Sequence, residues 1–268
     1  MKPTHEDRGA APQSQPTLAP TPRTRLVLNG GAGDDAGQAA VADAARRLPW
    51  VDIVRPADIE AFQDAVKGAR AEGYDVVAVA GGDGSVRAAT AAVASLDQGP
   101  ALAVIPCGTA NDFARSLHLP ADPVEALRAI AGGRLRPVDA ARIVTAEGET
   151  IFVNAATGGA TDAIEARLTP EMKRRWGRLA YARAALEALP TMSGAGVTVE
   201  VDGRVYAGAA TGLVVANGRW AGGQQVAPPA RPDDHLLDVV VVTAETLGER
   251  ASVLFDFVEG RHCESDNV

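Results

Sequence analysis

Two glycine-rich loops decide the fold of this chain: Ala80-Gly81-Gly82-Asp83-Gly84-Ser85 and Pro106-Cys107-Gly108-Thr109-Ala110-Asn111-Asp112-Phe113-Ala114-Arg115. Each loop follows an apolar run typical of a buried strand and leads into a helical pattern. In an open α/β sheet, ligands bind in the crevice outside the carboxyl ends of the strands. Glycine lets the backbone approach a ligand closely, and a helix N-terminus offers free N–H groups to anions. Two such loops in one lobe indicate a site for nucleotide phosphates.

Apolar runs and helical patterns alternate over the first half of the chain. Strands are expected at 25–28, 51–54, 76–80 and 101–105, and helices at 36–48, 58–71, 85–96, 111–117 and 123–131. The run at 76–80 is apolar throughout, as in a strand that is covered on both faces. This alternation predicts an α/β lobe with a parallel sheet and right-handed crossovers.

Beyond Val138-Asp139 the pattern changes to short strands with tight turns. We expect strands at 141–144, 151–154, 197–201, 205–207, 211–216 and 237–242, and helices at 169–189 and 246–259. Closely spaced strands of this kind favour antiparallel pairing. The predicted division is a disordered tail (1–23), an α/β nucleotide-binding lobe (24–137) and a second, β-rich antiparallel lobe (138–268).

The composition narrows the class of protein. The chain has 268 residues and a net charge of −8, which argues against non-specific binding to nucleic acid. Its two cysteines, Cys107 and Cys263, provide neither a disulfide framework nor a zinc site. No apolar run reaches the roughly 20 residues of a membrane span, and the N-terminus has no apolar signal segment. We therefore expect a cytoplasmic protein.

Several motifs resemble one family. The loop Gly81-Gly82-Asp83-Gly84-Ser85 resembles the GGDGT loop of the diacylglycerol kinase catalytic-domain family, and residues 105–115 resemble its L-P-x-G-T-x-N-D-F-A-R segment. Matches to later blocks lie at Phe152-Val153-Asn154, Gly158-Gly159, Ala216-Asn217-Gly218, Gly222-Gly223 and 228–238. NAD kinases and phosphofructokinases carry similar GGDG loops, but the Gly-Thr-x-Asn-Asp-Phe-Ala-Arg run is more specific. The bacterial soluble lipid kinase branch fits best.

The resemblance implies an ATP-dependent lipid kinase whose acceptor is a diacylglycerol-like, phosphatidylglycerol-like or sphingoid lipid, with the lipid bound to the second lobe. The implied ATP-binding residues are Asn29, Gly33, Gly82, Asp83, Gly84, Ser85 and Thr109. Asp83 is the expected catalytic carboxylate, acting on a metal or on the acceptor hydroxyl, and its alternative role is to form a turn. Thr109 could instead only cap the next helix, and residues 29–33 could form a simple turn. Asp112 and Arg115 are expected to pair along that helix.

The resemblance also implies a structural Mg²⁺ site in the segment Arg231-Pro232-Asp233-Asp234-His235-Leu236. Its ligands by position are the Asp234 carboxylate and the main-chain carbonyls of Arg231 and Leu236, which are oxygen ligands suited to a hard cation. His235 stands where the family has glycine, and if the glycine is needed there for a left-handed conformation, histidine is tolerated but strained. The alternative is a solvated acidic turn without metal.

A basic stretch surrounds Trp176 in this acidic chain. Its cationic residues are Lys173, Arg174, Arg175 and Arg178. A basic amphipathic helix can bind anionic lipid headgroups, which predicts peripheral association with a membrane surface. The alternative is a solvated helix face with Trp176 in the core. A homodimer is left open.

The chain departs from the family at its end. Family members carry a further pair of strands with an Asp-Gly-Glu motif, whose acidic residue is thought to activate the lipid hydroxyl, and this sequence contains no Asp-Gly-Glu. Three expectations remain open: a truncated kinase with an unfinished sheet and an exposed edge, an enzyme with another base, or an inactive nucleotide- or lipid-binding relative. A kinase for a soluble acceptor such as NAD is a further alternative, against which residues 108–115 argue.

Overall fold

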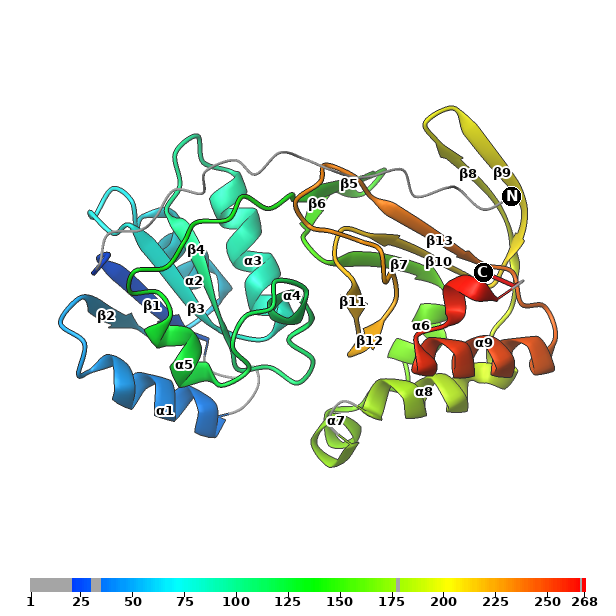
Figure 1. The fold of residues 1–268 in the computed structure, drawn as a ribbon, viewed down its shortest axis with the longest axis horizontal. Coiled ribbons are helices and arrows are strands. Elements are labelled where there is room, and N and C mark those ends of the chain that lie inside the picture. Colours follow the sequence, from blue (N-terminus) through cyan, green and yellow to red (C-terminus); the bar gives the residue numbers. More distant parts are fainter. Residues whose placement is uncertain (1–20, 30–34, 177–178, 266) are drawn as a thin grey trace.

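A computed structural model describes residues 21–29, 35–176, 179–265 and 267–268, which form two lobes lying side by side (Figure 1). Residues 1–20 of the expected tail, together with Gly33 and Arg178, lie outside the described residues. Arg23, at the end of that expected tail, is bound to the first lobe, because its backbone N–H donates to Asp75 Oδ2 at 3.1 Å.

The first lobe is built on a four-stranded parallel sheet with the order β2-β1-β3-β4. The strands are β1 (Thr24–Leu28), β2 (Val51–Val54), β3 (Val76–Gly81) and β4 (Ala101–Pro106). The helices are α1 (Asp35–Ala45), α2 (Ile59–Lys67), α3 (Asp83–Ala94), α4 (Asp112–Ser116) and α5 (Pro123–Arg128). The predicted α/β lobe with a parallel sheet is thus confirmed.

The two faces of this sheet are covered by different helices. Leu26 and Ala78 pack into one buried cluster with residues of α1 and α5, whereas Val27 and Val77 pack into another with residues of α2 and α3. Successive side chains of a strand point to opposite faces, so a strand covered on both faces must be apolar at every position. The apolar run of β3 meets this requirement.

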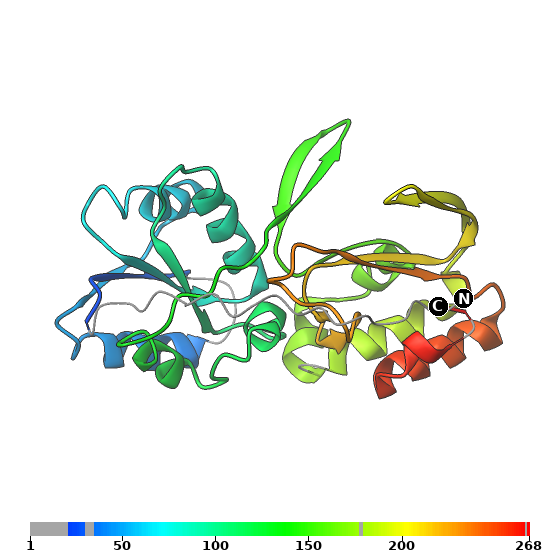
Figure 2. The ribbon, with the colours of Figure 1, turned by 45° about the horizontal axis from the view of Figure 1, so that its top comes forward.

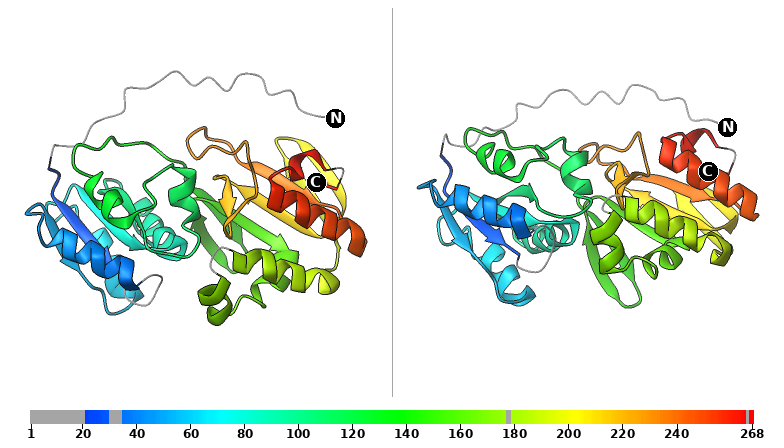
Figure 3. Two further views of the ribbon diagram at one scale, coloured as in Figure 1. Left: turned by 60° about the horizontal axis from the view of Figure 1, so that its bottom comes forward. Right: turned by 90° about the horizontal axis from the view of Figure 1, so that it is seen from below.

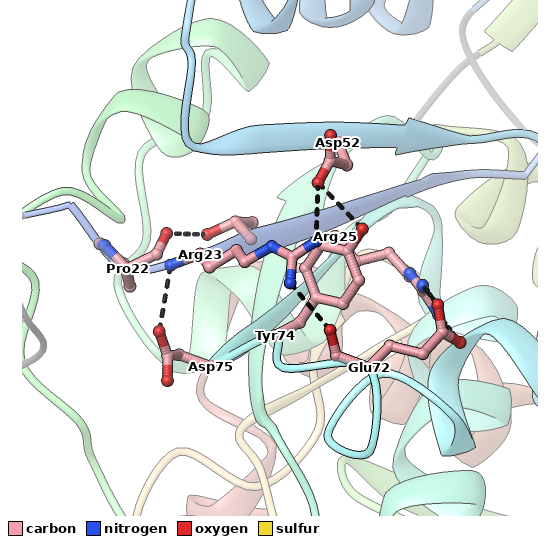
Figure 4. Close-up of polar contacts among 8 residues, drawn as sticks. Pro22, Arg23, Arg25, Asp52, Glu72, Tyr74 and Asp75 are labelled. Carbon is pink, nitrogen blue, oxygen red and sulfur yellow. Dashed lines mark hydrogen bonds and ion pairs between the residues drawn. The ribbon is translucent and has the colours of Figure 1, made fainter.

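A polar cluster closes the sheet at the amino ends of its strands (Figure 4). Arg25 is buried in β1, where its guanidinium stacks on the Tyr74 ring at 4.3 Å and pairs with Glu72. Arg23 lies 4.3 Å from the same ring, and the Tyr74 hydroxyl donates to Asp52 Oδ2 at 2.9 Å. These charges are matched among themselves, at the edge opposite the glycine loops.

The second lobe contains a three-stranded antiparallel sheet with the order β13-β10-β7. Its strands are β7 (Ala155–Gly159), β10 (Gly212–Ala216) and β13 (Asp238–Val242). Three separate hairpins accompany it: β5–β6 (Ala141–Thr145, Gly148–Phe152), β8–β9 (Ala195–Val201, Arg204–Ala210) and β11–β12 (Trp220–Ala221, Gln224–Gln225). The β5–β6 hairpin projects away from both lobes (Figure 2). The predicted antiparallel, β-rich character of this lobe is confirmed.

Helices line one side of this sheet, and α8 and α9 run next to each other there (Figure 3). They are α6 (Ala160–Glu165), α7 (Pro170–Trp176), α8 (Ala180–Ala188) and α9 (Leu247–Glu259). Among the described residues, no helix combines the length and apolar character needed to cross a bilayer.

Several elements differ from the sequence-based expectation. The helix expected at 169–189 is assigned as two helices, α7 and α8. Strand β7, helix α6 and the β11–β12 hairpin were not expected. The sequence of β7, Ala-Ala-Thr-Gly-Gly, has little intrinsic strand preference, and its strand conformation depends on pairing with β10.

Candidate functional site

The two glycine loops touch each other at the carboxyl edge of the parallel sheet. A Cβ added to Gly108 would lie 2.4 Å from Gly82 Cα, and one added to Gly82 would lie 3.1 Å from Gly108 Cα. The Cys107 N–H also donates to the Gly81 carbonyl at 3.0 Å. Glycine is required here because two backbones are in direct contact, which brings both predicted loops into one site.

Asn111 holds the second loop in shape. It adopts a left-handed conformation with φ of 51°, its side-chain oxygen accepts from the Gly108 N–H, and its side-chain nitrogen donates to the Gly108 carbonyl, both at 2.8 Å. Asn111 is also the N-cap of α4. Thr109 is exposed and lies two positions before this cap, so the alternative that Thr109 caps the helix is wrong.

Asp83 begins helix α3, two residues earlier than the helix start expected at Ser85. Its Oδ1 accepts a hydrogen bond from the Phe113 N–H at 3.0 Å, so the carboxylate faces the amino end of α4. Asp83 therefore links the two glycine loops rather than closing its own turn, and the carboxylate lies at their junction.

Ser85 and Asn29 form a pair inside the first lobe. The Asn29 side-chain nitrogen donates to the Ser85 hydroxyl at 2.8 Å, and Ser85 is buried. Gln38 donates to the Asn29 carbonyl at 3.0 Å. These contacts join the β1 end to the start of α3, and they place Ser85 behind the loop surface.

A cavity of about 290 Å³ lies where the lobes meet, and we call it the polar cavity because charged side chains stand among the apolar residues of its lining. From the first lobe it is lined by Asp83, Gly84, Arg87, Asp112 and Phe113, and from the second by Phe152, Val153, Asn154, Ala155, Thr157, Glu165, Tyr181, Ala221 and Gly222. Two carboxylates next to glycine loops, at the carboxyl edge of the sheet, occupy the place where an open α/β sheet binds its ligand.

Asp112 has a raised pKa in this cavity. Burial, with a contribution from the nearby Asp83 charge, raises the pKa of Asp112 to about 6. The Gly223 N–H donates to both of its oxygens at 3.1 Å, and the Arg115 guanidinium lies 3.7 Å away, which confirms the expected ion pair. From the sequence only Arg115 is predicted as a partner of Asp112. The contact with Gly223 comes from the other lobe, 111 residues along the chain.

Arg115 extends this connection between the lobes. Its guanidinium lies 3.5 Å from the centre of the Trp220 ring and donates to the Gly223 carbonyl at 3.2 Å. Gly222 and Gly223 have φ of 60° and 81° and form the two-residue turn between β11 and β12. Two successive positive φ values favour glycine, which explains the Gly-Gly pair.

A second cavity, of about 150 Å³, is almost entirely apolar. It lies between the β7-β10-β13 sheet and helices α8 and α9, with Leu213, Val214, Ala185 and Val253 among its lining residues. Thr157, Tyr181 and Ala221 line both cavities. The apolar cavity therefore adjoins the polar one.

The loop of the predicted magnesium site is tied to the first lobe by side chains. His235 has φ of 59°, so it adopts the left-handed conformation at the position of the family's glycine. Its N–H and Nδ1 contact the two oxygens of Asp139 at 2.7 and 2.8 Å, and Arg136 pairs with Asp233 at 2.7 Å.

The chemistry of the donor set suits Mg²⁺ at this loop. Asp234 Oδ1 accepts from the Leu236 N–H at 3.1 Å, so the carboxylate lies beside the residue whose carbonyl is an implied ligand. Within the described ranges, no group of three or more His, Cys, Asp or Glu side chains is arranged to hold a metal. A cation here would depend on the main-chain carbonyls of Arg231 and Leu236 as well as on Asp234.

The basic helix has an exposed aromatic residue. Trp176 is 39% exposed, so the alternative that places it in the core is wrong. Arg183 of α8 lies 4.6 Å from the Trp176 ring, and Leu179 is 62% exposed. Arg175 is exposed, and Lys173 and Arg174 belong to the same helix α7.

We predict that Gly108→Ala destabilises the first lobe, because its Cβ would stand 2.4 Å from Gly82 Cα and the backbones must separate. The expected loss in unfolding free energy is about 2 kcal/mol, measured by urea denaturation. Gly84→Ala is the matched control, since a Cβ there meets nothing within 4 Å. Equal stability of the two variants would contradict the loop contact.

The raised pKa of Asp112 predicts a pH dependence of stability. Between its usual value of 3.8 and about 6 the folded state binds more protons than the unfolded state, so stability falls as pH rises through this window. Relative to Asp112→Asn, the wild type is expected to lose on the order of 3 kcal/mol of unfolding free energy. Urea titrations from pH 4 to 8 measure this difference, and parallel profiles would refute it.

Comparisons with known proteins agree with this architecture. Residues 23–143 match the diacylglycerol kinase catalytic domain, and residues 155–268 match the YegS C-terminal NAD kinase beta sandwich-like domain. A diacylglycerol kinase of Staphylococcus aureus is 30% identical over 92% of this chain and 78% of its own length. One of Staphylococcus carnosus is 31% identical over 75% of this chain and 65% of its own length.

Solved structures give the same result. A putative diacylglycerol kinase from Bacillus anthracis superimposes with a TM-score of 0.69 at 26% identity, over 89% of this chain and 80% of the other. A second structure of a diacylglycerol kinase from that organism gives 0.67 at 28% identity, over 89% and 78% of the two chains. From its two domains and its relatives, the chain belongs to the diacylglycerol kinase family.

Proposed function

We propose that this protein is an ATP-dependent lipid kinase that transfers the γ-phosphoryl group to a hydroxyl group of a diacylglycerol-like lipid. One observation carries the proposal: Asp83 and Asp112 line a polar cavity that has glycine loops on one side and an apolar cavity on the other. The relatives named diacylglycerol kinase support the same reaction class.

The nucleotide would bind at the paired glycine loops. The N-cap of α3, Gly82, makes no side-chain capping bond, so the first turn of the helix can direct N–H groups at phosphate oxygens. A Cβ at Gly84 would meet nothing within 4 Å, which leaves space beside the loop. In this proposal Asn29, Gly33, Gly82, Asp83, Gly84, Ser85 and Thr109 form the nucleotide site, with Asn29 and Ser85 supporting the loops from behind.

The two carboxylates would act on the acceptor. Asp112, with a pKa of about 6, is ionised at neutral pH yet basic enough to accept the proton of an attacking hydroxyl. Asp83, held by the Phe113 N–H, would orient that hydroxyl or the transferred group.

Magnesium would bind at two places in this proposal. At the loop 231–236, Asp234 with the carbonyls of Arg231 and Leu236 would hold a structural ion that stiffens the contact between lobes. At the nucleotide, bound Mg²⁺ supplies neutralisation of phosphate charge. The carboxylates that line the polar cavity are Asp83, Asp112 and Glu165.

The apolar cavity favours a lipid over a soluble acceptor. A hydrocarbon chain gains free energy by leaving water for such a lining, whereas a polar acceptor would lose hydrogen bonds there. Because this cavity shares Thr157, Tyr181 and Ala221 with the polar one, a lipid can place its chain in the first and its hydroxyl in the second.

We predict that Asp83→Asn and Asp112→Asn each lower kcat at least about 100-fold, since each removes a carboxylate from the reacting centre. The assay uses labelled ATP, Mg²⁺ and dioctanoylglycerol in mixed micelles. Asp64→Asn, on the outer helix α2, is the matched control. In the same assay the wild-type rate should rise with pH around an apparent pKa of 6. Full activity of both site variants would overturn the assignment.

We also propose that the protein works at the cytoplasmic face of a membrane, bound peripherally through α7 and the residues that follow it. The cationic residues Lys173, Arg174, Arg175 and Arg178 would meet anionic headgroups, and Trp176 and Leu179 would enter the interface. The exposure of Trp176 and Leu179 supports this proposal.

Arg175→Glu is therefore predicted to weaken binding to phosphatidylglycerol-containing vesicles roughly 30-fold, because it changes the charge by two units and each unit near an anionic surface contributes about 1 kcal/mol. Cosedimentation at two salt concentrations measures the effect. Arg204→Glu, on the exposed β8–β9 hairpin, is the control for net charge. Equal losses in both variants would show a general effect of charge and contradict a specific surface.

A further inference from the structure

Tyr181 stands at the boundary between the two cavities. It is the second residue of α8, and it lines both the polar and the apolar cavity. On the polar side its neighbours include Asp112 and Glu165, and on the apolar side Ala185 and Val214. Any ligand that occupies both cavities must pass this ring.

The ring is held in place from the nucleotide-binding lobe. A Cβ at Gly222 would lie 2.6 Å from two carbons of the Tyr181 ring, so the turn packs directly on the ring. The next residue, Gly223, is bound by Asp112 and Arg115. The hydrogen bonds from α4 therefore hold this turn against one face of the Tyr181 ring.

The hydroxyl group of Tyr181 is a hydrogen-bond donor that stays protonated. Burial, with the charges of Glu165 and Asp112, raises the pKa of Tyr181 to about 12. Among the residues that the structure describes, no side chain or backbone group forms a hydrogen bond with the Tyr181 hydroxyl. By contrast, Arg250, the cationic residue of the apolar cavity, already donates to the carbonyls of Ala244 and Glu245.

An acyl lipid has one feature that matches this place. Between its hydrocarbon chain and its glycerol hydroxyl stands an ester carbonyl, which accepts hydrogen bonds and cannot donate them. With the chain in the apolar cavity and the hydroxyl near Asp83 and Asp112, the ester reaches the boundary. A buried carbonyl without a donor costs free energy, so a donor at this point discriminates between lipids.

We propose that Tyr181 is a specificity-determining residue, which donates a hydrogen bond to the ester carbonyl of the acceptor lipid and so selects ester-linked over ether-linked acceptors. This inference rests on the proposed lipid kinase function and names the chemical class of its substrate. Asp112 and Arg115 contribute as positioning residues, since they hold the turn against the ring.

The test compares Tyr181→Phe with the wild type on two acceptors, dioctanoylglycerol and its dioctyl ether analogue. Phenylalanine keeps the ring and its packing and removes only the donor. The KM for the ester is expected to rise about tenfold in the variant, while the KM for the ether and the KM for ATP stay unchanged. Tyr206→Phe is the matched control, because its hydroxyl bonds to Ala209 on the distant β9 strand.

Thr157→Val provides a second comparison, since Thr157 also lines both cavities. If this variant loses the ester preference and Tyr181→Phe keeps it, the proposal is overturned in favour of Thr157. An equal rise in KM for both lipids in Tyr181→Phe would mean that the residue acts only by packing, which also overturns it.

Calorimetric binding of the two lipids in the absence of ATP separates this inference from the proposed reaction. A wild type that phosphorylates neither lipid would refute the kinase proposal. Binding that is tighter for the ester in the wild type, and equal for both lipids in Tyr181→Phe, would still support the role of Tyr181. Equal binding of ester and ether by the wild type would refute it.

Discussion

The candidate site depends on the hydrogen bonds that Asp112 and Arg115 form with the turn at Gly223. One carboxylate receives the Gly223 N–H on both oxygens, and one guanidinium stacks on Trp220 and donates to the Gly223 carbonyl. Through this contact the first lobe holds a wall of the apolar cavity. A buried carboxylate is costly unless such donors and a cation surround it.

The same carboxylate connects structure with chemistry. Burial and the proximity of Asp83 raise the pKa of Asp112, and the Gly223 N–H and Arg115 limit that rise. The balance leaves a group that is ionised at neutral pH and still basic. The contacts that join the lobes therefore also set the pKa of this carboxyl group.

The second joint between the lobes is built on different chemistry. At the loop 231–236, Arg136 of the first lobe forms an ion pair with Asp233, and within the second lobe His235 is hydrogen-bonded to Asp139, both on a partly exposed surface. Water and salt weaken such pairs, so their net contribution is small unless several act together. A bound cation would add to this joint, whereas the Asp112 contact is already complete with protein groups.

The sequence by itself determined the features that depend on neighbouring residues. Apolar runs such as 76–80 predicted strands covered on both faces, and the glycine loops after them predicted the edge where the site lies. The pairing of Asp112 with Arg115, three positions apart on a helix, is also a local property. Each of these features depends on residues that are close together in the sequence, so it can be predicted from one sequence alone.

Only the tertiary structure decided the features that depend on distant contacts. Gly223 lies 111 residues from Asp112 along the chain. The burial and the raised pKa of Asp112 therefore cannot be predicted from the residues near it. Strand β7 exists because β10 pairs with it, and the exposure of Trp176, which the sequence left open, is set by the tertiary structure. Tyr181 gains its place between two cavities from a glycine turn on another element. Packing between segments that are distant in the sequence sets these properties, and the local conformational preferences of the residues do not predict that packing.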